Sequence, residues 1–136
     1  MNRLYNLLTV MVVMFGAFFA GQEALAKVLT GTGGDDALVG TDREDRLTGR
    51  RGEDRLKGNR GNDRLWGGHG NDEIISGHGN DKVYAGYGDD RIYARDPKGV
   101  DYIDCGGGFD KVKIIHRDDQ TLSNCERTLG SDRGDI

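Results

Sequence analysis

The residues best suited to chemistry in this sequence are aspartates that recur every nine positions. Carboxylate oxygens are ligands of hard cations, and Ca²⁺ takes six to eight oxygen ligands at about 2.3–2.6 Å. A ladder of stacked carboxylates is repulsive unless a divalent cation lies between its rungs. We therefore expect these side chains to bind a cation. The periodic aspartates are Asp36, Asp45, Asp54, Asp63, Asp72, Asp81 and Asp90.

Catalysis has no comparable support in the sequence. No serine, histidine and carboxylate stand at a recognisable spacing, and there is no HExxH zinc motif. His69 and His78 lie nine residues apart, which places them on opposite edges of a nine-residue repeat structure, so they cannot share an ion. We expect both to be exposed turn residues and the protein not to be an enzyme.

The aspartates belong to a nine-residue repeat that starts at Gly31 and runs through seven units to Tyr93. The eighth position is aliphatic in every unit, from Leu38 to Ile92. The fourth position is glycine in six of the seven units, and Arg43 is the exception. A fixed period of this kind indicates a stacked repeat architecture.

The period continues after a slip of two residues, Ala94-Arg95. Two further units, 96–104 and 105–113, place Asp101 and Asp110 at the sixth position again. Nine units therefore span residues 31 to 113. A solvated linker rich in glycine and aspartate is the alternative, but it would need no aliphatic residue in every ninth place.

The composition of each unit predicts a turn followed by a strand. Six residues rich in Gly, Asn and Asp favour a turn, and three residues with one inward aliphatic side chain favour a short strand. A glycine every four or five residues excludes a helix. Two units make one 18-residue coil, so alternate strands stack in two parallel sheets whose aliphatic side chains meet. Leu29 stands where a preceding unit would place its aliphatic residue and begins the first strand.

At this point the units resemble the RTX calcium-binding nonapeptide G-G-x-G-x-D-x-U-x. The resemblance implies an all-β fold, a right-handed parallel β-roll in which Ca²⁺ ions lie between turns of successive coils. In that family each ion takes the sixth-position carboxylate and backbone carbonyls of one turn, plus the matching groups 18 residues away. Nine turns paired two apart give at most seven sites, of which Asp45–Asp63, Asp81–Asp101 and Asp90–Asp110 look the least regular.

The resemblance thus implies a specific set of calcium ligands. Asn62, Asn71 and Asn80 precede three of the aspartates and either fix the turn or add a ligand. The implied side-chain ligands are Asp36, Asp45, Asp54, Asp63, Asp72, Asp81, Asp90, Asp101 and Asp110. The implied carbonyl ligands are those of Gly34, Gly52, Gly61, Gly70, Gly79 and Gly88.

The two ends of the chain predict export and a cap. Residues 1–26 have a basic start, an apolar stretch and a small-residue cleavage site, as in a signal peptide, with an uncleaved anchor as the alternative. Residues 27–113 form the roll, and 114–136 form a C-terminal cap and tail that resembles caps of secreted proteins with these repeats. Export permits a Cys105–Cys125 disulfide, the alternative being two free thiols. We expect a secreted protein, with the periplasm or cell surface also open.

The composition limits the remaining partners. The chain has 136 residues with 23 glycines, 35% hydrophobic residues and a net charge of −4, which excludes a large core and gives no reason to expect nucleic-acid binding. We expect a monomer with no membrane span after processing. Arg46, Arg64 and Lys82, beside Trp66 and Tyr84, form one outward face. This face either contacts an extracellular glycan or polyanion, as in an adhesion module, or is simply solvated.

Overall fold

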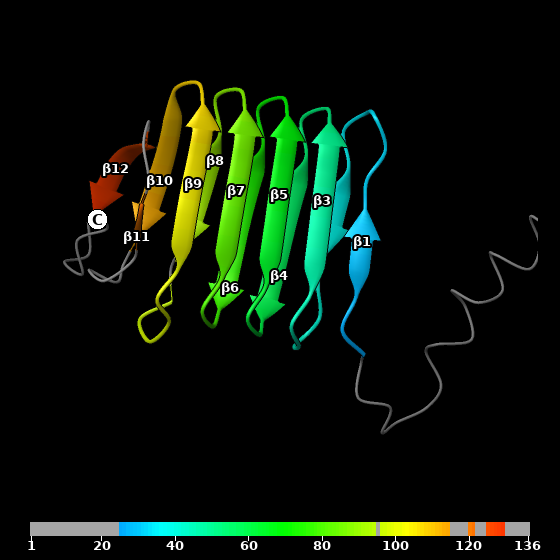
Figure 1. Ribbon diagram of the computed structural model, residues 1–136, viewed down its shortest axis with the longest axis vertical. Coiled ribbons are helices and arrows are strands. Elements are labelled where there is room, and N and C mark those ends of the chain that lie inside the picture. The colour runs from blue at the N-terminus through cyan, green and yellow to red at the C-terminus, as the bar shows by residue number, and fades with distance from the viewer. Residues whose placement is uncertain (1–24, 95, 115–119, 122–124, 130–136) are drawn as a thin grey trace, which may run out of the picture.

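The computed structural model describes residues 25–94, 96–114, 120–121 and 125–129. These residues form two parallel sheets of six strands each, which stack along one axis as a flattened solenoid (Figure 1). Residues 1–24, which hold most of the expected signal peptide, lie outside the described residues. The first sheet contains β1 (Val28–Thr30), β3 (Arg46–Arg51), β5 (Arg64–His69), β7 (Lys82–Tyr87), β9 (Tyr102–Gly107) and β11 (Gln120–Thr121). The second contains β2 (Ala37–Val39), β4 (Arg55–Arg60), β6 (Glu73–His78), β8 (Arg91–Ala94), β10 (Asp110–Ile114) and β12 (Cys125–Leu129).

The strand register follows the 18-residue coil. Leu29 pairs with Leu47, which confirms that the first strand begins before the first full unit. After the two-residue insertion the spacing becomes 20, because Val83 pairs with Ile103 and Ile92 pairs with Val112. Ala94, counted with the insertion in the sequence, is the last residue of β8 and pairs with Ile114. The two extra residues therefore lie between β8 and β9, and both sheets resume in register.

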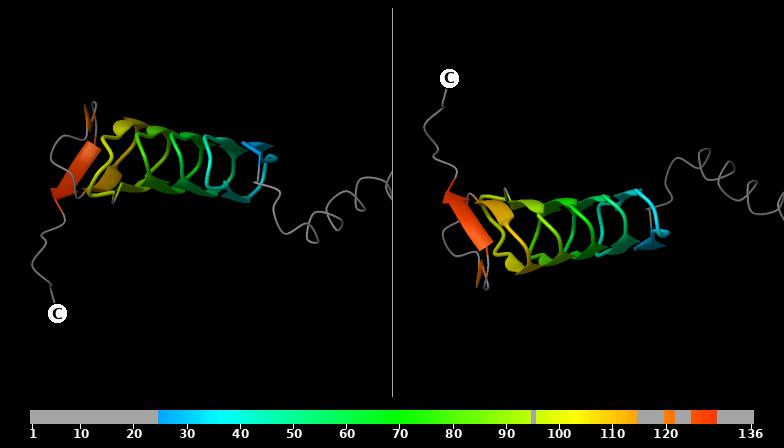
Figure 2. Two further views of the ribbon diagram at one scale, coloured as in Figure 1. Left: turned by 90° about the horizontal axis from the view of Figure 1, so that it is seen from below. Right: turned by 90° about the horizontal axis from the view of Figure 1, so that it is seen from above.

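The core is a single layer of aliphatic side chains between the two sheets, which face each other in the views along the strands (Figure 2). Each strand from β1 to β10 contributes its eighth-position residue, and outward residues flank it on both sides. Leu29 and Leu38 at the first coil are only partly buried. The fully buried members at this position are Leu47, Leu56, Leu65, Ile74, Val83, Ile92, Ile103 and Val112.

The central strands are longer than the three residues predicted. In β3 to β7 and in β9 the strand has six residues and runs into the first three positions of the next unit. Pairing continues there because Arg50 lies opposite Gly68 and Asn59 opposite Gly77. The repeat is therefore a six-residue strand joined by a tighter turn of three residues.

The C-terminal segment continues both sheets. β11 pairs with β9, and β12 pairs with β10. A disulfide joins Cys105 to Cys125, with a Cα–Cα distance of 5.6 Å, which confirms the predicted pairing. It ties β9 of one sheet to β12 of the other. The part of the chain that the structure describes has no helix long and apolar enough to cross a membrane.

Candidate metal centre

The sixth-position aspartates form two ladders, one along each edge of the solenoid. In each rung, Oδ1 of one aspartate accepts a hydrogen bond from the backbone N–H of the aspartate one coil earlier, at 2.7–2.9 Å. The three pairs that looked least regular in the sequence make the same bond. The seven rungs are Asp36–Asp54, Asp45–Asp63, Asp54–Asp72, Asp63–Asp81, Asp72–Asp90, Asp81–Asp101 and Asp90–Asp110.

The second carboxylate oxygen has no donor in most rungs. Oδ2 is buried without a hydrogen-bond partner in six aspartates: Asp54, Asp63, Asp72, Asp81, Asp90 and Asp110. Buried polar atoms are normally paired, so six unpaired oxygens at one repeat position indicate a ligand that the protein atoms do not supply. A hard cation is the group that a buried carboxylate oxygen fits best.

Burial also disturbs the titration of these carboxyls. Desolvation, with repulsion from neighbouring aspartates, raises the pKa of Asp72 and of Asp81 to about 7. The same causes raise the pKa of Asp63 and of Asp90 to about 6. The hydrogen bond from the backbone N–H one coil earlier lowers each value but does not offset burial. A cation between the rungs would reverse this effect by favouring the charged form.

Glycine at the first position of the unit lets two oxygens approach the same Cα. A Cβ on Gly49 would lie under 3.0 Å from Asp54 Oδ2 and from the Gly67 carbonyl oxygen of the next coil. Gly58 and Gly67 are crowded in the same way by the aspartate of their own turn and by a carbonyl oxygen one coil later. The first-position carbonyls thus join the aspartates at the turn, although the sequence analysis did not name them. The recurrent first glycine was the signal that pointed to them.

The six glycine carbonyls implied as ligands share one placement. Each carbonyl oxygen faces the next coil, under 3.0 Å from where that coil's fourth-position glycine would carry a Cβ. These oxygens line the gap between successive turns. They are the carbonyls of Gly34, Gly52, Gly61, Gly70, Gly79 and Gly88, which face Gly52, Gly70, Gly79, Gly88, Gly99 and Gly108 respectively.

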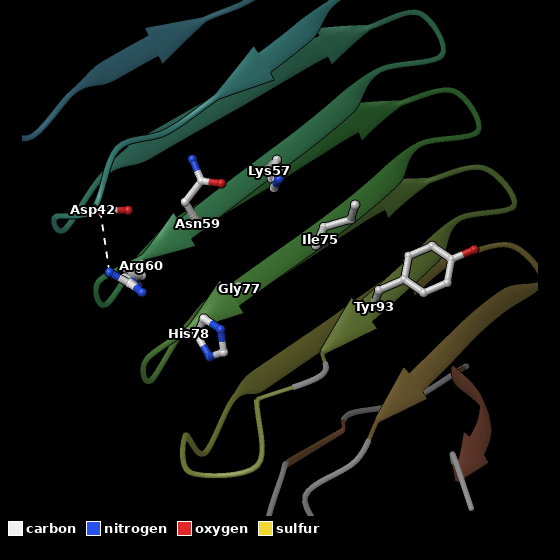
Figure 3. A pocket seen from close by; sticks show the side chains of 8 residues that line it. All are labelled: Asp42, Lys57, Asn59, Arg60, Ile75, Gly77, His78 and Tyr93. Atoms are coloured by element: carbon white, nitrogen blue, oxygen red, sulfur yellow. Dashed lines mark ion pairs between the residues drawn. The ribbon is translucent and has the colours of Figure 1, made fainter. Parts of the chain in front are cut away.

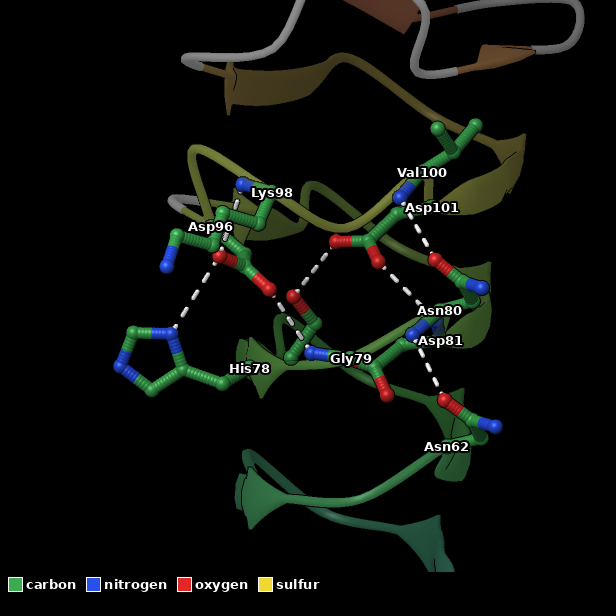
Figure 4. A network of polar contacts seen from close by, with 10 residues as sticks. Asn62, His78, Gly79, Asn80, Asp81, Asp96, Lys98, Val100 and Asp101 are labelled. Carbon is green, nitrogen blue, oxygen red and sulfur yellow. Dashed lines mark hydrogen bonds and ion pairs between the residues drawn. The ribbon is translucent and has the colours of Figure 1, made fainter.

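A second ladder, at the fifth position, fixes the turns. Asn62 Oδ1 accepts a hydrogen bond from the Asn80 N–H at 2.9 Å, and Asn80 Oδ1 accepts one from Val100 (Figure 4). In these bonds the N–H of the later coil donates to a side chain of the earlier coil. In the aspartate ladder the N–H of the earlier coil donates to a side chain of the later coil. Asp35 and Asp89 take part in the same way, by accepting from Glu53 and Phe109, and the sequence analysis missed both.

In each of the first two turns, a threonine donates hydrogen bonds to the aspartate of the same turn. Thr32 donates its backbone N–H and its hydroxyl to Asp36 Oδ2, at 2.6 and 3.0 Å. Thr41 donates the same two groups to Asp45, and the Lys27 N–H reaches Asp45 Oδ1 at 2.5 Å. A threonine at the second position thus explains why neither aspartate has an unpaired Oδ2.

The other candidate sites are separate from these ladders. His69 stacks on Tyr87 at the end of β5, and His78 pairs with Asp96 at 3.4 Å at the end of β6, so the histidines lie in different sheets. A surface groove of about 540 Å³ crosses β4, β6 and β8, with Ile75 and Tyr93 among its lining side chains (Figure 3). Within the described ranges no three His, Cys, Asp or Glu side chains converge on one point. A bound cation therefore needs backbone oxygens as well as carboxylates.

The residues present fit a hard cation. Unpaired carboxylate oxygens, carbonyl oxygens aimed across the same gap and glycines that permit their approach recur along both edges. A family model described as the RTX calcium-binding nonapeptide repeat (4 copies) matches residues 30–65, 48–83, 66–96 and 79–112, which together cover more than half of the chain. Comparison with curated proteins gave no significant match.

Proposed function

Because the chain belongs to the RTX calcium-binding nonapeptide-repeat family, we propose that it is an exported protein that binds several Ca²⁺ ions between successive coils and folds on binding them. The observation that carries this proposal is the set of six buried Oδ2 atoms without a donor. We assign the sixth-position aspartates as side-chain ligands and the glycine carbonyls between the coils as backbone ligands. The described residues contain no evident catalytic domain, and we assign the repeats to binding.

The spacing of the coils favours Ca²⁺ over Mg²⁺. Neighbouring strands lie about 4.7–4.9 Å apart, which is about twice a Ca²⁺–oxygen distance of about 2.3–2.6 Å. Mg²⁺ needs about 2.0–2.1 Å and near-ideal octahedral geometry, which an irregular set of carboxylate and carbonyl oxygens from two coils suits less well. Extracellular calcium modules bind at about 10⁻⁴ to 10⁻³ M, and we expect this range here.

Export and domain boundaries complete the proposal. We propose a signal peptide at 1–26, a roll at 27–113 and a cap at 114–136. The Cys105–Cys125 disulfide supports export, because disulfides persist in oxidising compartments. The strands β11 and β12 support a cap that closes the roll, because each adds the last strand to one sheet.

Calorimetry of the oxidised mature protein tests the calcium proposal. We expect several Ca²⁺ ions to bind with one heat signal that includes folding, because metal binding and folding are coupled. Mg²⁺ at the same concentrations serves as the control and should give little heat and no added β-structure. Absence of Ca²⁺ binding at 10 mM, about tenfold above the weak end of the expected range, rules the proposal out.

A second function, binding of an anionic polysaccharide, is favoured by the outer face of the first sheet. Arg46, Arg64 and Lys82 lie directly opposite one another in register, and like charges so placed destabilise a sheet. Trp66 and Tyr84 stack beside them with ring centroids 5.7 Å apart. The Arg64 side chain is paired with Glu44 at 2.6 Å, whereas within the described residues neither the Arg46 nor the Lys82 side chain forms an ion pair. A linear polyanion along the solenoid axis would offset this repulsion.

A binding screen against sulfated, carboxylated and neutral polysaccharides tests this second function in the presence of calcium. The Arg46→Ser/Lys82→Ser variant should lose salt-sensitive binding to the anionic polymers. Arg91→Ser/Lys111→Ser, which removes two exposed cations that pair in register on the opposite sheet, is the matched control. Equal losses in both variants, or no binding by the wild type, would exclude the role of this face.

A further inference from the structure

One rung of the aspartate ladders is closed by a side chain. Ser76 is fully buried, and its hydroxyl donates a hydrogen bond to Asp101 Oδ2 at 2.8 Å. Oδ1 of Asp101 accepts the Asp81 N–H at 2.9 Å. Both carboxylate oxygens of Asp101 therefore have donors, and Asp101 is not among the six aspartates with an unpaired Oδ2.

Ser76 is the only residue at its repeat position that can make this bond. It stands first in its unit, five residues before Asp81, the earlier aspartate of its rung. The other six rungs have glycine or alanine at that position, and neither has a side-chain donor. Those residues are Gly31, Gly40, Gly49, Gly58, Gly67 and Ala85.

The turn that completes this rung is also held by protein hydrogen bonds (Figure 4). It lies between β8 and β9, and Asp96 in it accepts hydrogen bonds from the Gly79 N–H at 2.8 Å and the Lys98 N–H at 3.0 Å. The widened turn is thus attached to the preceding coil through Asp96. An ion is not needed to fasten this turn.

We propose that the Ser76 hydroxyl closes the Asp81–Asp101 rung to calcium, so that six of the seven rungs bind an ion. An ion at Asp101 Oδ2 would have to share that oxygen with the Ser76 hydroxyl hydrogen, whose positive end already points at it and opposes a cation there. In each of the other rungs the corresponding oxygen is already unpaired. This inference rests on the proposed calcium function and assigns the ions to particular coils.

The matched exchange of Ser76 and Ala85 tests the inference. Ala85 is also fully buried and first in its unit, and it stands 25 residues before Asp110, as Ser76 stands 25 residues before Asp101. Neither substitution disturbs a glycine. Bound Ca²⁺ would be counted by equilibrium dialysis and by native mass spectrometry of the full oxidised protein at saturating calcium.

We expect six ions in the wild type, seven in Ser76→Ala, five in Ala85→Ser and six in the double variant. If Ser76→Ala binds the same number of Ca²⁺ ions as the wild type, the inference is overturned. If Ala85→Ser does not fold, the Ser76→Ala result alone decides. Seven ions in the wild type also overturn it. No calcium bound by the wild type rejects the proposed function itself, whereas a wild type that binds calcium beside variants with unchanged counts rejects only the role of Ser76.

Discussion

At the scale of single residues, six of the nine sixth-position aspartates have two unlike oxygens. Oδ1 holds the preceding coil through a backbone N–H, whereas Oδ2 is buried without a donor from Asp54 through Asp90. Without a cation the charged ladder therefore opposes folding at neutral pH. With a cation the same atoms bind the coils together.

The raised pKa values predict that acid stabilises the calcium-free roll. An unfolded aspartate titrates near 3.9, whereas burial raises the pKa of Asp72 and Asp81 to about 7 in the folded state. The folded state then holds more protons than the unfolded state between about pH 4 and 7, so its stability falls as pH rises through that window. In chelator, far-UV circular dichroism should show more β-structure at pH 5 than at pH 7.5.

Protons and calcium compete for the same oxygens, so the calcium midpoint of folding should rise as pH falls from 7.5 to 5.5. Ionic strength would be held constant, because surface charges are screened by salt. A midpoint that is independent of pH would contradict the assignment of these carboxyls as ligands.

Asp72 should contribute to two calcium sites. Its Oδ1 accepts from Asp54 and its N–H donates to Asp90, so it takes part in two rungs. Asp72→Asn keeps an acceptor but removes the charge and one oxygen, and we expect half-saturation by calcium to need about tenfold more ion, or about 1.4 kcal/mol. Calorimetric titration measures this shift.

Asp104→Asn is the control for Asp72. Asp104 is paired in register with Tyr84 on the outer face and accepts a hydrogen bond from the Gly106 N–H at 3.2 Å, which asparagine can retain. Its calcium midpoint should stay within about twofold of the wild type. Equal shifts in the two variants would show that general charge, rather than the ladder, governs binding.

The sequence predicted the aspartates correctly as a set but not how each is satisfied. The period alone placed Asp36 and Asp54 in equivalent sites. The two sites differ in the structure, because Thr32 donates hydrogen bonds to Asp36 Oδ2 whereas Asp54 Oδ2 has no donor. A hydroxyl four residues before a carboxylate is a local contact that only the turn conformation reveals.

At the scale of the element, the turn depends on residues with positive φ. Gly68, Gly77 and Gly86 at the second position have φ of 112° to 118°, and Arg50 and Asn59 at the same position have φ of 91° and 84°. Side chains rarely adopt this conformation, and asparagine tolerates it better than arginine. Arg50 is thus a strained position within an otherwise regular coil.

Gly68→Ala should destabilise the calcium-loaded roll. The new Cβ would lie under 3.0 Å from the backbone of Arg50, at a φ of 118°. Such strain costs about 1–3 kcal/mol. Thermal unfolding at saturating calcium measures the loss.

Gly33→Ala is the matched control, because no atom lies within 4 Å of its added Cβ and no positive φ is required there. Its melting temperature should remain near the wild-type value. A comparable loss at Gly33 would mean that glycine acts through the unfolded chain rather than through this turn.

The nine-residue period predicted the two sheets and their register but not the strand length. The glycines at the first and second positions read as turn residues because they weaken most strands. Here Gly68 pairs with Arg50 and Gly86 inside the ladder, since positive φ bends the strand without ending it. Composition cannot distinguish such a bend from a turn.

At the scale of the whole molecule, the solenoid has one layer of core side chains and therefore little apolar burial per coil. Stability of such an array is a sum of repeat and neighbour terms, so the interface between coils decides whether it folds. The ladders lie at that interface. The disulfide between Cys105 and Cys125 adds a constraint at one end only.

Removal of the disulfide should lower stability without abolishing calcium binding. The disulfide closes a loop of 20 residues, and in the chain-entropy model such a cross-link adds roughly 3 kcal/mol to the free energy of unfolding. A Cys105→Ser/Cys125→Ser variant should need more calcium to fold and should melt at a lower temperature than the oxidised wild type. If the two proteins have the same calcium midpoint and melting temperature, the disulfide does not stabilise the roll.

Far-UV circular dichroism of the oxidised mature protein, first in excess chelator and then with added Ca²⁺ at neutral pH, tests the central claim most directly. The account predicts a largely disordered spectrum in chelator and a cooperative rise of β-structure with calcium, because ion binding supplies the free energy that the thin core lacks. Full β-structure in excess chelator, unchanged by calcium, would contradict it.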